Sequence, residues 1–175
     1  MASAASSSCP ATAAVSDDPE GVHVWHEVKR AWEKLPEEVR RRAHLVNLPM
    51  EDADENAAMV NALQRQAEIV VQKSIAEGFG LTVAEAMWKR RPVIGTRVGG
   101  IQDQIVDGES GLLVDDPHDL EALARAIGSL ADDRGLAAEL GERARERVYE
   151  HFLMPTRLTE YAELLAELGA LSKGE

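Results

Sequence analysis

Runs of Val, Ile and Leu alternate along the chain with segments in which apolar residues recur every three or four positions. The runs are HLVNL at residues 44–48, IVVQK from Ile69, PVIGT at residues 92–96 and LLV from Leu112. Continuous apolar runs of this length are typical of strands buried on both faces, and the periodicity between them is typical of helices. The pattern therefore predicts an α/β fold with a partial doubly wound, Rossmann-like parallel sheet.

The periodic segments predict helices at residues 21–42, with a break at Pro36, at 52–68, from Thr82 to about Arg90, and at 101–105. Three further helices follow the last strand. Two apolar stripes in these later helices are expected to be packing surfaces. They consist of Leu120, Leu123, Ala124, Ile127 and Leu130, and of Leu158, Tyr161, Leu164, Leu165 and Leu168.

Residues 1–20 are rich in Ala and Ser and carry no periodic apolar pattern, so we expect a disordered lead-in followed by one domain over residues 21–175. The first of the four predicted strands comes only after more than forty residues. Open doubly wound domains usually contain more strands than this. We therefore expect the domain to be incomplete at its start.

The composition limits the classes of partner. The chain has 31 acidic and 19 basic residues and a net charge of -12, which argues against nucleic acid or an anionic membrane as the main partner. Its single cysteine, Cys9, cannot form an internal disulfide and fits a cytoplasmic protein. The start of the chain indicates neither a secretory signal nor a membrane span. His23 and His26 lack a convincing set of further ligands, so we expect no metal.

The segment EGFGLTVAE at residues 77–85 places a carboxylate on each side of a glycine-rich turn, where a predicted strand ends and a helix begins. Ligands of open parallel sheets bind at this edge. Gly78 and Gly80 let the backbone approach a ligand closely. Glu85 could then accept hydrogen bonds from ribose hydroxyls, and Glu77 would face a second polyol. The first amides of the helix would point at an anion: those of Gly80, Leu81 and Thr82.

A second interpretation of the same residues needs no ligand. Thr82-x-x-Glu85 fits a capping box, in which the two side chains satisfy the free N–H groups of the helix itself. From the residues alone, the role of Glu85 therefore stays open between capping and binding. Capping does not explain Glu77.

The string EGFGLTVAEA resembles the Glu-x7-Glu motif of retaining glycosyltransferases of the family-4 type, which have the GT-B fold. The segment from GTRVGG to ALARAI resembles the region that follows the motif in those enzymes, and the resemblance covers about Asn61 to Tyr161. The longer string VVQKSIAEGFGLTVAEAMWKRRPVIG, together with DDPEG at Asp17–Gly21, is similar to the trehalose synthase branch, which joins glucose from a nucleotide sugar to free glucose.

The resemblance implies that the chain is the later part of the second, donor-binding domain of such an enzyme. It implies a nucleoside diphosphate glucose as donor substrate and no cofactor. The implied roles are catalysis and hexose binding by Glu77, hexose binding around Gly78, Phe79 and Gly80, diphosphate binding by the amides of Leu81 and Thr82, and ribose binding by Glu85.

The family's reaction retains the anomeric configuration, and front-face attack assisted by the leaving phosphate is the mechanism usually proposed for it. The resemblance does not extend to the acceptor domain, nor to the loop that normally supplies an Arg and a Lys to the diphosphate. Lys73 and Arg97 are the nearest basic candidates for that role. The isolated chain is accordingly expected to be weakly active or inactive.

The expected partners are a nucleotide sugar and either a separate acceptor-type domain or a second copy bound through the C-terminal helix. Two other functions remain open from the sequence. The chain could be a non-catalytic interaction module that keeps the fold, or a nonfunctional remnant whose sheet edge is exposed.

Overall fold

The computed structural model describes residues 19–49 and 51–171, and the chain divides into two compact units, Met1–Ala62 and Leu63–Glu175. The expected disordered lead-in lies outside the described residues except for its last two positions. These two, Pro19 and Glu20, belong to the first helix rather than to the lead-in.

The first two helices of the first unit are separated near a proline. They are α1 (Pro19–Glu33) and α2 (Glu37–Arg40), and Pro36 forms the N-cap of α2. Proline cannot donate a backbone hydrogen bond within a helix, so the break falls where the sequence predicts it. The indole nitrogen of Trp32 donates to the carbonyl oxygen of Ala43 at 2.8 Å, which ties the chain after α2 to α1.

Residues 44–48, predicted as a strand, form none. Val46 is 60% exposed, and the described part of the first unit offers no strand for this segment to pair with. An apolar run without a hydrogen-bonding neighbour cannot build a ladder. The predicted helix that follows is present as α3 (Ala53–Gln66), which runs from the end of the first unit into the second.

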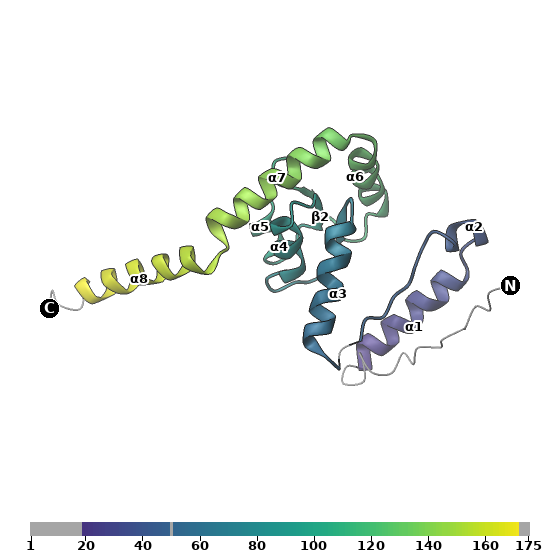
Figure 1. Cartoon of the computed structure of the whole chain (residues 1–175), viewed down its shortest axis with the longest axis horizontal. Helices are drawn as coiled ribbons and strands as arrows, with labels where there is room; N and C mark the ends of the chain where they lie inside the picture. The colour runs from purple at the N-terminus through teal and green to yellow at the C-terminus, as the bar shows by residue number, and fades with distance from the viewer. Residues whose placement is uncertain (1–18, 50, 172–175) are drawn as a thin grey trace. The chain divides into compact units, whose positions relative to one another are not determined.

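A three-stranded parallel sheet forms the centre of the second unit (Figure 1). Its strands β1 (Val70–Gln72), β2 (Val93–Thr96) and β3 (Leu112–Val114) lie in the order β1-β2-β3. Val71 faces Ile94 across the first pair. The predicted parallel α/β architecture is confirmed, with three of the four predicted strands.

Helices connect and follow the strands. They are α4 (Leu81–Trp88), α5 (Ile101–Gln104), α6 (Leu120–Asp132), α7 (Arg134–His151) and α8 (Met154–Leu171). Aspartate side chains cap two of them, because a carboxylate can accept the free N–H groups of a first turn. Asp119 accepts from the amide of Ala122 at 2.8 Å, and Asp133 accepts from that of Leu136 at 2.9 Å.

Both faces of the sheet are buried. Successive residues of a strand point to opposite faces, so Val93 joins one cluster with residues of α4, α5 and α7, whereas Ile94 joins another with residues of β3, α6 and α7. Both side chains are fully buried. Burial on two faces explains why the strands are continuously apolar rather than alternating.

The two predicted helix stripes differ in burial. On α6, Leu130 is buried at 2% exposure but Leu120 is 65% exposed, so the packed face is rotated from the one predicted. On α8, the five apolar side chains of the stripe are 50% to 67% exposed, and the prediction of a packing surface is wrong for the second unit by itself. No helix among the described residues combines the length and apolar character needed to cross a bilayer.

Candidate functional site

The turns that follow β1 and β2 meet at one edge of the sheet, because parallel strands bring their carboxyl ends together. The first turn, residues 73–80, leads into α4, and the second, residues 97–100, leads into α5. The amide of Gly100 donates to the carbonyl oxygen of Gly78 at 3.0 Å and joins the two turns. This hydrogen bond therefore fixes the two turns relative to each other at the edge of the sheet where the sequence predicts a ligand.

Helix α4 begins without a side-chain cap. Its N-cap is Gly80, which adopts the left-handed conformation at φ 86° and ψ 55°. The helix starts at Leu81, so Thr82 lies inside its first turn rather than at the N-cap. The capping-box interpretation of Thr82 and Glu85 is therefore wrong. The first amides of α4 have no intrahelical acceptor, as at any helix start, and are left to bind an external group.

Two glycines of the second turn let it pass close under the first. A Cβ on Gly99 would lie 1.7 Å from the carbonyl oxygen of Glu77, and one on Gly100 would lie 2.7 Å from the carbonyl oxygens of Gly78 and Phe79. Both positions exclude any side chain. The turn that carries Glu77 rests on this glycine pair.

Glu77 is partly buried and is held by local hydrogen bonds. Gln72 donates to the hydroxyl of Ser74 at 3.0 Å, and that hydroxyl donates to Oε2 of Glu77 at 3.4 Å. The other carboxylate oxygen, Oε1, accepts from the amide of Gly78 at 3.1 Å. Thr96 anchors the backbone of Ser74 by donating to its carbonyl oxygen at 2.5 Å. The carboxylate is thus oriented by the end of β1 and retains lone pairs for a ligand.

Glu85 lies one turn into α4 with its side chain half exposed. Its Oε2 is 3.8 Å from the Nζ of Lys89, an i,i+4 pair that favours one orientation of the carboxylate. Lys89 is itself largely buried and also donates to Gln64. Glu85 can accept two hydrogen bonds from a diol, and no helix cap competes for it.

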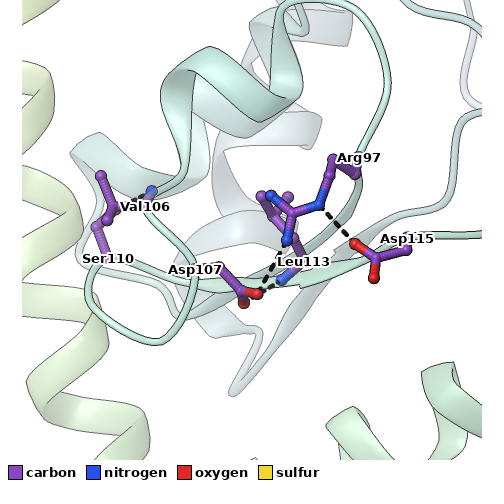
Figure 2. Close-up of polar contacts among 6 residues, drawn as sticks. All are labelled: Arg97, Val106, Asp107, Ser110, Leu113 and Asp115. Atoms are coloured by element: carbon purple, nitrogen blue, oxygen red, sulfur yellow. Dashed lines mark hydrogen bonds and ion pairs between the residues drawn. The ribbon is translucent and has the colours of Figure 1, made fainter.

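The two basic candidates for the diphosphate lie in different surroundings. Lys73 is exposed at the end of β1, and its ammonium forms no ion pair with any described residue. Arg97, at the end of β2, is already paired with two carboxylates (Figure 2). Its Nε lies 2.5 Å from Asp115, and its Nη2 lies 3.1 Å from Asp107.

The ion pairs of Arg97 link the ends of β2 and β3. Asp107 also accepts from the amide of Leu113 at 2.8 Å, so one carboxylate joins a strand to the turn before it (Figure 2). The hydrogen bond to Asp115 raises the pKa of Arg97 above its ordinary value, and the nearby Asp107 carboxylate adds to the increase. This cluster stabilises the fold locally, and Arg97 would have to leave it to reach a phosphate.

Phe79 and Trp88 are both partly exposed. The ring of Phe79 meets the edge of Phe152 at a centroid distance of 6.2 Å, and the guanidinium of Arg145 lies 4.7 Å from the Trp88 ring. Within the described part of the chain, no group of three His, Cys, Asp or Glu residues is placed to hold a metal ion.

A cavity of about 350 Å³ lies at the opposite edge of the sheet. Ile69 and Pro92, which directly precede β1 and β2, contribute to its lining. Arg134 on its rim is paired with Glu68 at 3.0 Å. Because ligands of open parallel sheets bind at the carboxyl ends of the strands, this cavity does not compete with the turn as the candidate site.

Sequence reasoning missed three residues that support the turn: Gly99, Gly100 and Gln104. Paired glycines two residues after a buried strand were a usable signal, because such a pair often marks a close backbone approach. Gln104 gave a weaker signal, as a polar residue between the apolar Ile101 and Ile105. It is fully buried.

Comparison with known proteins agrees with this geometry. Trehalose synthase from Thermococcus litoralis is 43% identical over 149 residues, which is 85% of this chain and 34% of that protein. Sucrose-phosphate synthase from Thermosynechococcus elongatus has a similar structure, with a TM-score of 0.65 and 32% identity over 87% of this chain and 35% of that one. Anabaena HepE in complex with UDP-glucose matches with a TM-score of 0.56 and 26% identity, over 62% of this chain and 30% of that one.

This α/β fold with its parallel sheet matches the C-terminal domains of GT-B glycosyltransferases. The family model for glycosyl transferases group 1 matches residues 53–147, more than half of the chain. The chain belongs to this family, and the family predicted from the EGFG motif is confirmed. This chain spans about a third of the length of the trehalose synthases that it matches.

Proposed function

We propose that the chain binds a nucleoside diphosphate glucose at residues 77–85 and serves, in the cytoplasm, as the donor-binding part of a retaining glycosyltransferase. The observation that carries the proposal is the open space at Gly78. A Cβ built there meets no described atom within 4 Å outside its two chain neighbours, although the oriented carboxylate of Glu77 and the uncapped start of α4 adjoin it. The fold therefore does not need this glycine, whereas a ligand that fills the space would.

The donor sugar is assigned to the turn and the diphosphate to the helix start. Glu77, with its two oxygens oriented by Ser74 and Gly78, accepts hydrogen bonds from hexose hydroxyls. The backbone of Phe79 and Gly80 forms the rest of this wall. The diphosphate binds the amides of Leu81 and Thr82, where the helix dipole favours negative charge.

Lys73 is the preferred cation for the diphosphate. It is exposed and unpaired among the described residues, whereas Arg97 would first have to break two ion pairs. Glu85 is assigned to the ribose hydroxyls, because it lies on the first turns of α4 with its carboxylate half exposed.

Catalysis in this proposal rests on positioning and on charge stabilisation. The bond between the glucose anomeric carbon and the diphosphate breaks as the acceptor hydroxyl attacks from the same face, and the acceptor's proton passes to the leaving phosphate. The α4 amides and Lys73 stabilise the charge that develops on the diphosphate. Glu77 holds the hexose so that its anomeric carbon faces the acceptor.

For the complete enzyme we propose trehalose as the product, formed from the donor glucose and free glucose. The support is the 43% identity to a trehalose synthase across most of this chain. The acceptor sugar then binds a separate acceptor-type domain. If a two-domain form made a different glycoside and no trehalose from the same donor, this assignment would fall while donor binding stood.

The test is thermal unfolding of the chain with UDP, UDP-glucose, ADP and ADP-glucose. A ligand at about one hundred times its Kd stabilises the folded state by about 2.7 kcal/mol, which is easily measured. We expect one nucleotide sugar to raise the Tm, and we expect Glu85→Ala and Glu77→Ala to abolish most of the shift. Glu121→Ala is the matched control, because Glu121 is also an exposed helical carboxylate with an i,i+4 basic neighbour.

Comparing the free nucleotide with the nucleotide sugar distinguishes the proposed role of Glu85 from that of Glu77. Glu85→Ala should weaken UDP and UDP-glucose together, because both contain the ribose, whereas Glu77→Ala should weaken UDP-glucose alone. A wild-type Tm that none of the four ligands moves would refute the proposal.

A non-catalytic interaction module is the second candidate, and the exposed apolar stripe of α8 favours it. A module of this kind would form a defined complex with an acceptor-type domain while showing no Tm response to nucleotide sugars. The same melt therefore separates the two candidates.

A further inference from the structure

Gln104 lies at the end of α5, directly beneath the turn. Its side chain is fully buried, and its Nε2 donates to the carbonyl oxygen of Phe79. A Cβ on Gly80 would lie 3.6 Å from the same nitrogen. The amide group is therefore in contact with the Phe79–Gly80 peptide from below.

The oxygen of the same side-chain amide lacks a hydrogen-bond donor among the described residues. Within the described part of the chain, Oε1 of Gln104 is buried and has no hydrogen-bond partner. A buried unpaired acceptor is costly, and an apolar side chain of similar size would avoid that cost. Unlike an apolar residue, Gln104 has an N–H group that donates to the carbonyl oxygen of Phe79.

Fixing the carbonyl oxygen of Phe79 also fixes the group on the opposite side of that peptide. In a trans peptide the C=O and N–H bonds point in opposite directions, and all peptides described here are trans. With the carbonyl directed down at Gln104, the N–H of Gly80 is directed away from it. That N–H adjoins the start of α4, where the diphosphate is assigned.

Gln104 is itself held firmly. Its backbone oxygen accepts from Nε of Arg147 at 2.6 Å, and the Nη2 of Arg147 donates to the carbonyl oxygen of Asp103 at 2.7 Å. The backbone amide of Gln104 donates to Gly100 at 3.2 Å. The support under the turn thus reaches α7 and does not depend on the short α5 alone.

We propose that Gln104 is a positioning residue for the donor: it orients the Phe79–Gly80 peptide so that the turn binds the hexose and its β-phosphate. The inference rests on the proposed function and deepens it. Gln104 touches no substrate in this proposal and acts through the backbone of the turn.

The variant that tests this is Gln104→Met, which keeps the side-chain length and removes the N–H group. Gln102→Met, at the exposed glutamine on the same helix, is the matched control. Calorimetric titration with UDP-glucose and UDP should show that Gln104→Met weakens UDP-glucose about tenfold and UDP, which keeps the β-phosphate but lacks the hexose, only about threefold. The Tm should stay within about 3 °C of wild type, because the unsatisfied oxygen is removed along with the donor.

Amide hydrogen exchange gives a readout that needs no ligand. The amide of Gly100 donates to Gly78, so a loosened turn should exchange it faster. We expect at least a threefold increase at Gly100 in Gln104→Met, with the amides of α6 unchanged.

The outcomes separate this inference from the proposed function. If wild type binds UDP-glucose and Gln104→Met binds it equally well, the inference is overturned. An equal loss of UDP and UDP-glucose with a lowered Tm would also overturn it, because that pattern marks a purely structural role. If wild type binds none of UDP, UDP-glucose, ADP and ADP-glucose, the proposed function fails, and unchanged exchange at Gly100 then overturns the positioning role as well.

Discussion

Gly78 and Gly99 differ in what surrounds them, although both belong to the turns at the carboxyl edge of the sheet. A Cβ on Gly78 would point into open space, and its φ is outside the left-handed region. Gly99 has φ 47° and no room beside the carbonyl of Glu77. The fold therefore does not require glycine at position 78, but it does require glycine at position 99.

We predict that Gly78→Ala changes the free energy of unfolding by less than about 0.5 kcal/mol. It should nevertheless weaken UDP-glucose about tenfold, because the added methyl group occupies the space assigned to the hexose. Gly99→Ala is the contrasting variant and should lower stability by about 3 kcal/mol through clash and backbone strain. Chemical denaturation and calorimetric titration measure both effects. Wild-type affinity in Gly78→Ala would show that the space is not part of the donor site.

Arg97 gives a prediction about pH. Its folded-state pKa is raised, so the stability from its ion pairs is fully present below the unfolded pKa and is lost only as the pH rises through the folded value, in strongly alkaline solution. The difference in stability between wild type and Arg97→Met should therefore stay constant from about pH 6 to pH 9 and shrink with added salt. Denaturation curves at several pH values test this. A difference that changes across that range would show that other groups control the cluster.

Among the elements, the strands of the second unit were predictable because their apolar runs are buried on both faces. The run LLV at residue 112 matches β3 at both ends, and PVIGT exceeds β2 by one residue. The same rule failed at residues 44–48. Composition reveals whether a segment could form a strand, but only a neighbouring strand supplies its hydrogen bonds.

The helix that carries Glu85 shows a second limit. The pattern Thr82-x-x-Glu85 left a capping box open as one interpretation, but the left-handed Gly80 starts α4 one residue sooner than expected, so Thr82 is not its N-cap. The contacts that support the turn could not be predicted from local rules, although the glycine pair was itself a usable signal. Gly99 and Gln104 are more than twenty positions from Glu77 and act only once β2 has brought them under the turn.

Helix α6 offers a test at the level of one element. Gly128 lies within it, and a Cβ there would meet no described atom within 4 Å apart from its chain neighbours and the nearby backbone of α6 itself. Glycine in a helix interior costs about 0.5–1 kcal/mol relative to alanine. Gly128→Ala should raise the free energy of unfolding by this amount and leave nucleotide binding unchanged. A destabilised variant would mean that another surface packs against this position.

At the scale of the whole molecule, the apolar stripe of α8 is the feature least explained by the second unit alone. Leu158, Leu165 and Leu168 are each more than half exposed. Exposed contiguous apolar side chains usually mark a surface that binds another protein or a second copy. The stripe therefore fits the proposed contact with an acceptor-type domain, and in its absence it should drive self-association.

We predict that the chain self-associates as its concentration rises and that Leu165→Lys reduces this association. The lysine places a charge at the centre of the stripe, which must lose water whenever the stripe is covered. Ala166→Lys is the matched control, because it adds the same charge at an exposed position on another face of α8. Sedimentation velocity over a range of concentrations measures the effect. If both variants reduced association equally, general charge repulsion would explain the result, and the stripe would lose its role as the contact surface.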